Sequence, residues 1–214
     1  MRHSRLTRNL TLLALGLWLA AAVVGGATGA INQPDAPPLL LGAYILLPIG
    51  VFVAAYAMSA SFRAFTERLS LTWMVGAHVW RFVGLGFVLG WLSGALPAGF
   101  ALPAGLGDVA AALGALLLVP ALRKGAASRG RLLAWNVFGF VDLVAALVLG
   151  NLYSSASTGV LATGSVTTES MVTFPVSLIP TFLVPLFLLL HGLTFKRIAS
   201  PEPPPRHGAR HGAR

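Results

Sequence analysis

Six long apolar runs alternate with short connections along this chain, and they constrain its fold more than any other feature. A helix needs about 20 apolar residues to cross a bilayer at a rise of about 1.5 Å per residue. A soluble fold of 214 residues could not bury so much apolar surface, because 56% of the residues are hydrophobic and only 10% are charged. We therefore expect membrane-spanning helices at about 10–27, 39–60, 71–92, 106–122, 132–153 and 172–195.

The basic residues predict how these helices are oriented. Fourteen of the fifteen Lys and Arg residues lie in the N-terminal segment, the second and fourth connections and the C-terminal segment; the fifteenth is Arg81. The positive-inside rule then predicts an all-α bundle of six transmembrane helices, with both termini in the cytoplasm and the protein in the inner (plasma) membrane. Because the basic residues lie in short clusters between apolar runs, we expect them to contact anionic lipid headgroups of the bilayer rather than nucleic acid.

The two ends of the chain carry different signals. The first run resembles a signal peptide, but its apolar stretch of about 18 residues exceeds the usual 7–15, which favours a retained helix. The last residues, "SPEPPPRHGARHGAR", are rich in proline and then basic, and they lack the apolar content of a packed core. The sequence thus predicts one membrane domain over 1–198 and a disordered tail over 199–214.

The third connection is uncharged and contains the motif ALPAG twice, within 95–107. Its Pro and Gly residues favour a plain outer loop, although its apolar character also permits a re-entrant turn. Asp108 follows at the outer edge, where we expect it to cap the fourth helix; a cap there is also compatible with an entrance site.

Several polar side chains fall inside the apolar runs. A charged group at the bilayer centre costs about 2.5–3.5 kcal/mol on insertion scales, so it usually faces a partner or a cavity. Counting residues from the cytoplasmic end places both Arg81 and Asp142 at a height of about 16 Å, and the sequence predicts that they pair. The predicted polar core, which is also the possible transport site, comprises His78, Arg81, Asp108, Asn136, Asp142 and His191.

The two histidines permit a second interpretation, as the axial ligands of one haem. The same count places His78 at a height of about 12 Å and His191 at about 7 Å. Axial ligands must approach one iron from opposite sides at matching depth, so a helix tilt would have to absorb this difference of about 5 Å. Haem is the one cofactor that the sequence suggests.

Helix faces add detail to this picture. In the fifth run, one face carries a stripe of five residues: Trp135, Gly139, Asp142, Ala146 and Gly150. The small residues of this stripe permit close helix approach around the carboxylate. In the third run, Gly86, Gly90 and Gly94 predict a second packing face. The sixth run contains Pro175, Pro180 and Pro185, which should free the carbonyls of about Met171, Val176 and Thr181, either lining a polar cavity or only kinking the helix.

Neither a nucleotide-binding loop nor a hydrolase or metalloprotease motif is present, and the absence of cysteine excludes a catalytic thiol. The stretches "HVWR", "GALPAGFALPAGLGD", "FVDLVAALVLG" and "PTFLVPLFLLLHGL" together resemble a group of small bacterial multi-pass membrane proteins without an assigned activity. This resemblance covers about residues 71–195 and implies an inner-membrane protein, but no substrate.

Three classes of function, with an intramembrane enzyme as a further alternative, are compatible with the sequence. The first is a small-solute or proton-linked transporter, in which Arg81 and Asp142 form a gated pair and the histidines relay protons. The second is a non-catalytic membrane partner or scaffold, in which the ion pair only fixes the helix register. The third is a haem protein with His78 and His191 as ligands.

Overall fold

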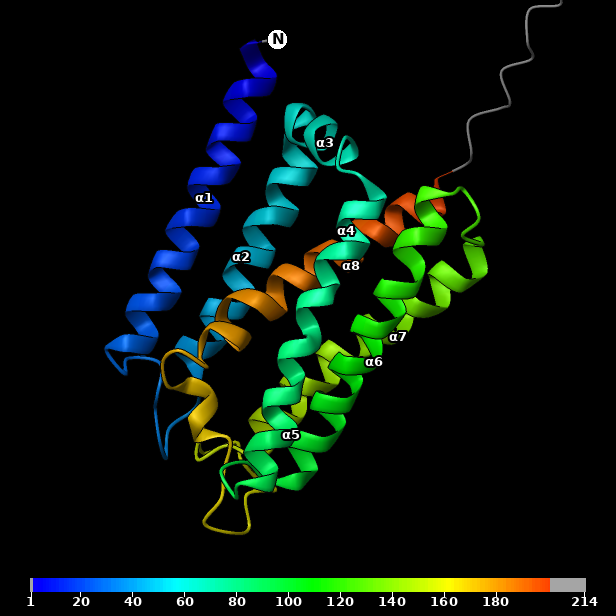
Figure 1. The fold of residues 1–214 in the computed structure, drawn as a ribbon. Helices are drawn as coiled ribbons and strands as arrows, with labels where there is room; N and C mark the ends of the chain where they lie inside the picture. The colour runs from blue at the N-terminus through cyan, green and yellow to red at the C-terminus, as the bar shows by residue number, and fades with distance from the viewer. Residues whose placement is uncertain (1, 201–214) are drawn as a thin grey trace, which may run out of the picture.

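The computed structural model describes residues 2–200, and within this range the chain forms helices and no strands (Figure 1). The elements are α1 (Arg2–Ala27), α2 (Leu39–Met58), α3 (Ala60–Glu67), α4 (Leu71–Ala77), η1 (His78–Gly84), α5 (Leu85–Leu92), α6 (Ala98–Arg123), α7 (Arg129–Leu152), η2 (Glu169–Val172), η3 (Ile179–Leu183) and α8 (Val184–Ala199).

Six segments of the described chain are long and apolar enough to cross a membrane, which confirms the predicted number of spans. They are Arg5–Ala27, Leu39–Met58, Leu71–Leu92, Ala98–Arg123, Arg129–Leu152 and Ile179–Ala199. The N-terminus, α3, the turn between α6 and α7 and the end of α8 lie together at one end of the bundle (Figure 1). The basic connections therefore share this end, which we call the basic end, and the connections without Lys or Arg lie at the opposite end.

The helices differ in how much of their surface is covered. No residue of α2 is buried, and α1 and α2 expose many leucines and valines, as helices in contact with lipid do. The buried residues are concentrated where α4, η1, α5, α6, α7 and α8 pack together. The polar residues predicted from the sequence belong to these six elements.

The predicted boundary of the fourth span is wrong, because α6 begins at Ala98 rather than near 106. Most of the 95–107 connection is therefore helix, neither a plain outer loop nor a re-entrant turn. Pro97 has extended backbone angles, and its carbonyl accepts hydrogen bonds from the amides of Phe100 and Ala101. Phe100, Ala101 and Ala104 are buried beside Phe87, so packing overrides the helix-breaking tendency of the ALPAG repeats.

The third span is not a uniform α-helix, because η1 is a 3₁₀-helix between α4 and α5. A 3₁₀-helix has three residues per turn, so residues at i and i+3 eclipse each other. The predicted packing face of three glycines is not present: Gly86 has no neighbour at its Cβ position, and Gly94, with a φ of 75°, ends α5. The close approach is made instead by Gly84, one turn after Arg81.

The sixth span begins at Ile179, not near 172. The short η2 precedes it, and its first turn, η3, is a π-helix that leads into α8. Pro185 lacks the amide that would bond to the Thr181 carbonyl, as predicted, and this carbonyl accepts the indole N–H of Trp18 on α1 at 2.9 Å. The predicted tail lies outside the described residues, apart from Ala199, which ends α8, and Ser200.

Candidate functional site

Arg81 is the centre of a buried polar cluster. His78, Arg81 and Gly84 follow one another at intervals of three residues along η1, and all three are buried. The 3₁₀ geometry aligns them on one face, which packs against α6, so the guanidinium points into the bundle rather than toward lipid. Arg81 is only 1% exposed, and at that depth a permanent cation requires fixed acceptors.

The guanidinium has four acceptors on three helices. Its Nε donates to Asp108 Oδ1 at 2.7 Å, and its Nη2 donates to Asp142 Oδ2. Its Nη1 donates to the Gly139 carbonyl at 3.0 Å and lies 3.3 Å from Nε2 of His191. The predicted contact between Arg81 and Asp142 is thus present, and Arg81 links α6, α7 and α8.

The predicted role of Asp108 as the N-terminal cap of the fourth helix is wrong. Because α6 begins at Ala98, well before Asp108, Asp108 lies in the helix interior and is 6% exposed. A Cβ on Gly105 would lie 2.7 Å from the Gly84 carbonyl, so α6 and η1 cross at their backbones. This glycine contact brings Asp108 to Arg81.

The hydrogen bonds of His191 define its tautomer. Its Nδ1 lies 2.7 Å from Oδ1 of Asn136, and Nδ2 of Asn136 donates to the His191 carbonyl at 3.1 Å. Since the amide oxygen only accepts, Nδ1 carries the proton, and Nε2 is left to accept from Arg81. Asn136 therefore holds His191 as a neutral acceptor toward the guanidinium.

His78 is buried and lacks a hydrogen bond to either ring nitrogen. Its ring lies 4.0 Å from that of His191, between centroids, and also packs against Phe187 and Trp135. The two rings are in contact although the residue count placed His78 and His191 at different depths, and α8 crosses the bundle obliquely (Figure 1). A haem plane does not fit between two rings in contact, so haem binding by His78 and His191 would require η1 and α8 to separate. The described residues contain no group of three or more metal ligands.

The cluster is not charge-balanced. Two carboxylates, Asp108 and Asp142, share one guanidinium, and the neutral histidines add nothing. With both carboxylates ionised, the cluster carries one negative charge in excess. An uncompensated charge at this depth is costly, so neutrality requires one further positive charge, which a proton or a bound cation can supply.

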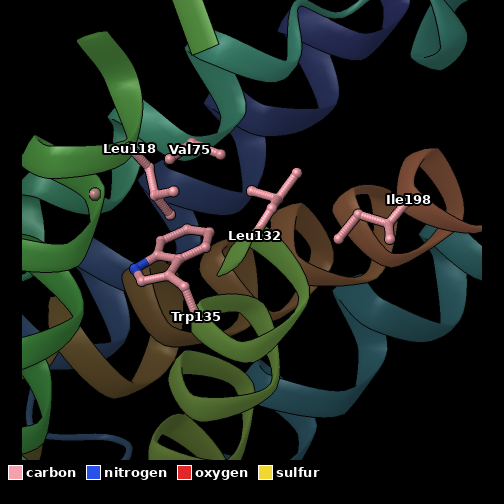
Figure 2. Close-up of a cluster of buried hydrophobic side chains, with 6 residues drawn as sticks. Val75, Leu118, Leu132, Trp135 and Ile198 are labelled. Atoms are coloured by element: carbon pink, nitrogen blue, oxygen red, sulfur yellow. The ribbon is translucent and has the colours of Figure 1, made fainter. Parts of the chain in front are cut away.

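An apolar plug closes the cluster toward the basic end of the bundle. It consists of Val75, Ala115, Leu118, Leu132, Trp135 and Ile198 (Figure 2). Trp135 is its innermost member: the indole packs on both histidines and donates to the Ala111 carbonyl at 2.9 Å. Packed apolar side chains therefore lie between the basic end and the charged side chains.

Toward the opposite end, a cavity of about 300 Å³ begins at Asp108. Its wall is mostly apolar and includes Leu143, Ala146 and Gly150 of α7, which continue the stripe predicted around Asp142. Polar residues, among them Asn32, Asn151 and Glu169, lie at its mouth, near the connections that lack Lys and Arg. The cluster thus has a closed side and an open side.

Sequence reasoning missed three features of this site. The Gly139 carbonyl is an acceptor for Arg81, and a Cβ at Gly139 would lie 2.7 Å from the His191 ring. A Cβ on Gly107 would collide with Oδ1 of Asp142, which explains the glycine beside Asp108. The sequence shows this glycine in the stretch "GLGD", directly before Asp108.

Comparison with known proteins places the chain in a family. A family model described as "Domain of unknown function (DUF8737)" matches residues 38–199, which contain every residue of the cluster. No curated protein and no solved structure matches the chain. Since the matched segment covers well over half of the sequence, the chain belongs to the family of the domain of unknown function DUF8737.

Proposed function

We propose that this protein is a proton-linked transporter of a small solute in the inner (plasma) membrane, and that the cluster around Arg81 is its coupling site. The observation that carries the proposal is the charge balance, in which two buried carboxylates share one guanidinium. A fixed ion pair that only set helix register would need one carboxylate. A second one gives the protein a place where a proton is bound and released.

The asymmetry of the surroundings supports the same function. The cluster adjoins a cavity at one end of the bundle and a packed plug at the other. A transporter that alternates access has one side closed at a time. In this proposal the described conformation is open away from the basic end, and the opposite conformation requires the plug around Trp135 to part.

Two irregular segments are suited to that movement. The 3₁₀-helix η1 carries His78 and Arg81, and the π-helix η3 lies in the wall of the cavity. Irregular turns inside helices often mark functional hinges. His78, whose ring nitrogens have no partner, lies between the charged groups and the plug and serves in this proposal as the next proton acceptor toward the basic end.

The basic end faces the cytoplasm in this proposal. Single cysteines at Ser157 and Ser128 of this cysteine-free chain test the orientation. Ser157 lies in a connection without Lys or Arg, and Ser128 directly precedes α7, so an impermeant thiol reagent outside intact cells should label position 157 and spare position 128. Labelling of position 128 alone would reverse the orientation.

Proton movement tests the function itself. We expect reconstituted protein to change the internal pH of dye-loaded liposomes when a transported solute from a panel of cations, neutral molecules and anions is added. The Asp142→Asn variant should lose this change, because its cluster is neutral without a proton. Asp35→Asn, an exposed acid outside the cavity, is the matched control and should retain it. If no solute of any class moves protons, the transporter proposal is refuted.

A further inference from the structure

We infer that the cavity beside Asp108 binds a small lipophilic monocation, with an apolar body and a single cationic nitrogen, in exchange for a proton. This inference rests on the proposed function, since it names the class of solute that the transporter carries. Four observations support it: the cavity's size, its lining, the free carboxylate oxygen and the state of Arg81.

The cavity has the dimensions of a small-molecule site. Its volume of about 300 Å³ lies at the lower end of the range of roughly 300–1,000 Å³ for such sites. The wall is formed by apolar side chains such as Leu41, Phe87, Leu147 and Met171. This wall suits the apolar body of a ligand and offers few groups to a strongly hydrated one.

The charges of the wall are of one sign. Asp108 lies at the deep end of the cavity and Glu169 at its mouth, and no Lys, Arg or His residue lines it. Glu169 is held there by Asn32, whose Nδ2 donates to its Oε1 at 3.0 Å. A cation entering from this end passes one carboxylate and reaches a second, whereas an anion is repelled by both.

Asp108 has an acceptor available for the ligand. Its Oδ1 is occupied by Nε of Arg81, whereas its Oδ2 accepts no hydrogen bond from any described residue. A cationic nitrogen beside Oδ2 would supply the positive charge that the cluster lacks. Binding of the cation and binding of the proton then satisfy the same excess charge, so each should displace the other.

Arg81 does not make the site suitable for an anion. Its side chain is 1% exposed, does not line the cavity and already donates to two carboxylates. A neutral ligand, such as a lipid acyl chain, would fill the apolar part but leave the excess charge uncompensated. Among anionic, neutral and cationic ligands, only a lipophilic cation both fits the apolar wall and compensates the excess negative charge.

A matched pair of probes tests the inference in nanodiscs by equilibrium dialysis, with empty nanodiscs as the blank. Benzyltrimethylammonium is a permanent cation, and neopentylbenzene has the same shape without the charge. We expect the wild type to bind the cation more tightly than the neutral probe. Asp108→Asn should weaken cation binding by at least about tenfold, the equivalent of about 1.4 kcal/mol, with little effect on the neutral probe. Asp35→Asn is the control and should bind as the wild type does.

Acidification should also weaken cation binding, because a proton then occupies the cluster. The groups that face this proton are Arg81 and His78 of η1, Asp108 of α6, Asp142 and Asn136 of α7 and His191 of α8. Ala146→Phe provides a variant that leaves these groups intact. It fills the cavity from α7 and should abolish binding of both probes, so the test does not depend on Asp108→Asn being folded.

Three results would overturn the inference: equal affinity for the two probes, no binding of the cation by the wild type, or unchanged cation binding in a folded Asp108→Asn variant. The liposome experiment separates this failure from that of the transporter proposal. Proton movement driven only by neutral or anionic solutes would refute the cation site and would still support the transporter proposal. Cation binding without any proton movement retains the site and refutes transport.

Discussion

Replacement of Arg81 by glutamine should destabilise the protein more than any other single change in the cluster. Glutamine leaves two buried carboxylates without their shared cation, and breaking a buried pair by removing one partner costs about 3–5 kcal/mol. Asp108→Asn or Asp142→Asn should cost less, about 1–3 kcal/mol, because each leaves one carboxylate and one guanidinium. Unfolding in nanodiscs, followed by thermal shift and by denaturant, measures this order.

A double-mutant cycle sharpens the result. The Arg81→Gln/Asp142→Asn variant should lose less stability than the sum of the two single variants, because the second change removes a carboxylate that the first left unpaired. Arg129→Gln, an exposed arginine at the start of α7, is the matched control and should change stability little. Additive losses, or a larger loss in Asp108→Asn than in Arg81→Gln, would contradict the charge balance on which the proposed function depends.

Truncation of Trp135 should have the second largest effect, because it opens the plug. The indole is 8% exposed, packs on both histidine rings and joins α7 to α6 through the Ala111 carbonyl. Trp135→Ala should cost about 3–5 kcal/mol, the usual range for removing a buried aromatic side chain. It should also let protons cross reconstituted membranes without a solute, since the layer between the cluster and the basic end is then incomplete.

Two further variants separate these effects. Trp135→Phe retains a ring but loses the hydrogen bond to Ala111. It should lower the free energy of unfolding by about 1 kcal/mol and should not let protons leak across the membrane. Trp73→Ala removes a tryptophan that is 58% exposed on α4. This variant should neither lose comparable stability nor let protons cross the membrane. A Trp135→Ala protein that folds and does not leak would show that the plug is not the barrier at the basic end.

The sequence predicted the features that depend on the length of the apolar runs, the distribution of the basic residues and the position of a charge within a span. The six spans followed from apolar length alone, and the common end of the basic connections followed from the alternation of charge. The contact between Arg81 and Asp142 followed from matching heights, because both residues lie near the middle of their spans and neither can face lipid. The predictions of the spans and of the basic end average over many residues. The prediction of the ion pair depends on the large free-energy cost of exposing a charged side chain to lipid.

The predictions that failed depended on local detail that packing decides. Pro and Gly around 95–107 indicated a loop, but burial of Phe100 and Ala101 extends α6 to Ala98 and moves Asp108 from a helix end to a helix interior. The 3₁₀ turns of η1 shift the packing face from Gly86 to Gly84. One irregular turn of this kind rotates every later side chain, and the glycine spacing does not reveal it.

The candidate site was predicted as a set of residues but not as an arrangement. All six predicted residues lie in one cluster, yet a count of 1.5 Å per residue did not predict that the two histidine rings are in contact, because it ignores side-chain direction and the oblique path of α8. The tautomer of His191, the closed plug and the cavity beside Asp108 depend on contacts between distant segments. Such contacts become visible only once the helices are placed in space.

The release of protons on cation binding tests the central claim most directly, namely that one excess negative charge is satisfied by either a proton or a cation. Benzyltrimethylammonium is added to the nanodisc-embedded protein in weakly buffered solution, and the proton release is titrated between about pH 5 and 8. We expect a maximum of about one proton released per cation bound by the wild type, and none by Asp142→Asn, whose cluster is already neutral. Saturable cation binding by the wild type with no proton release at any pH in this range would contradict the claim.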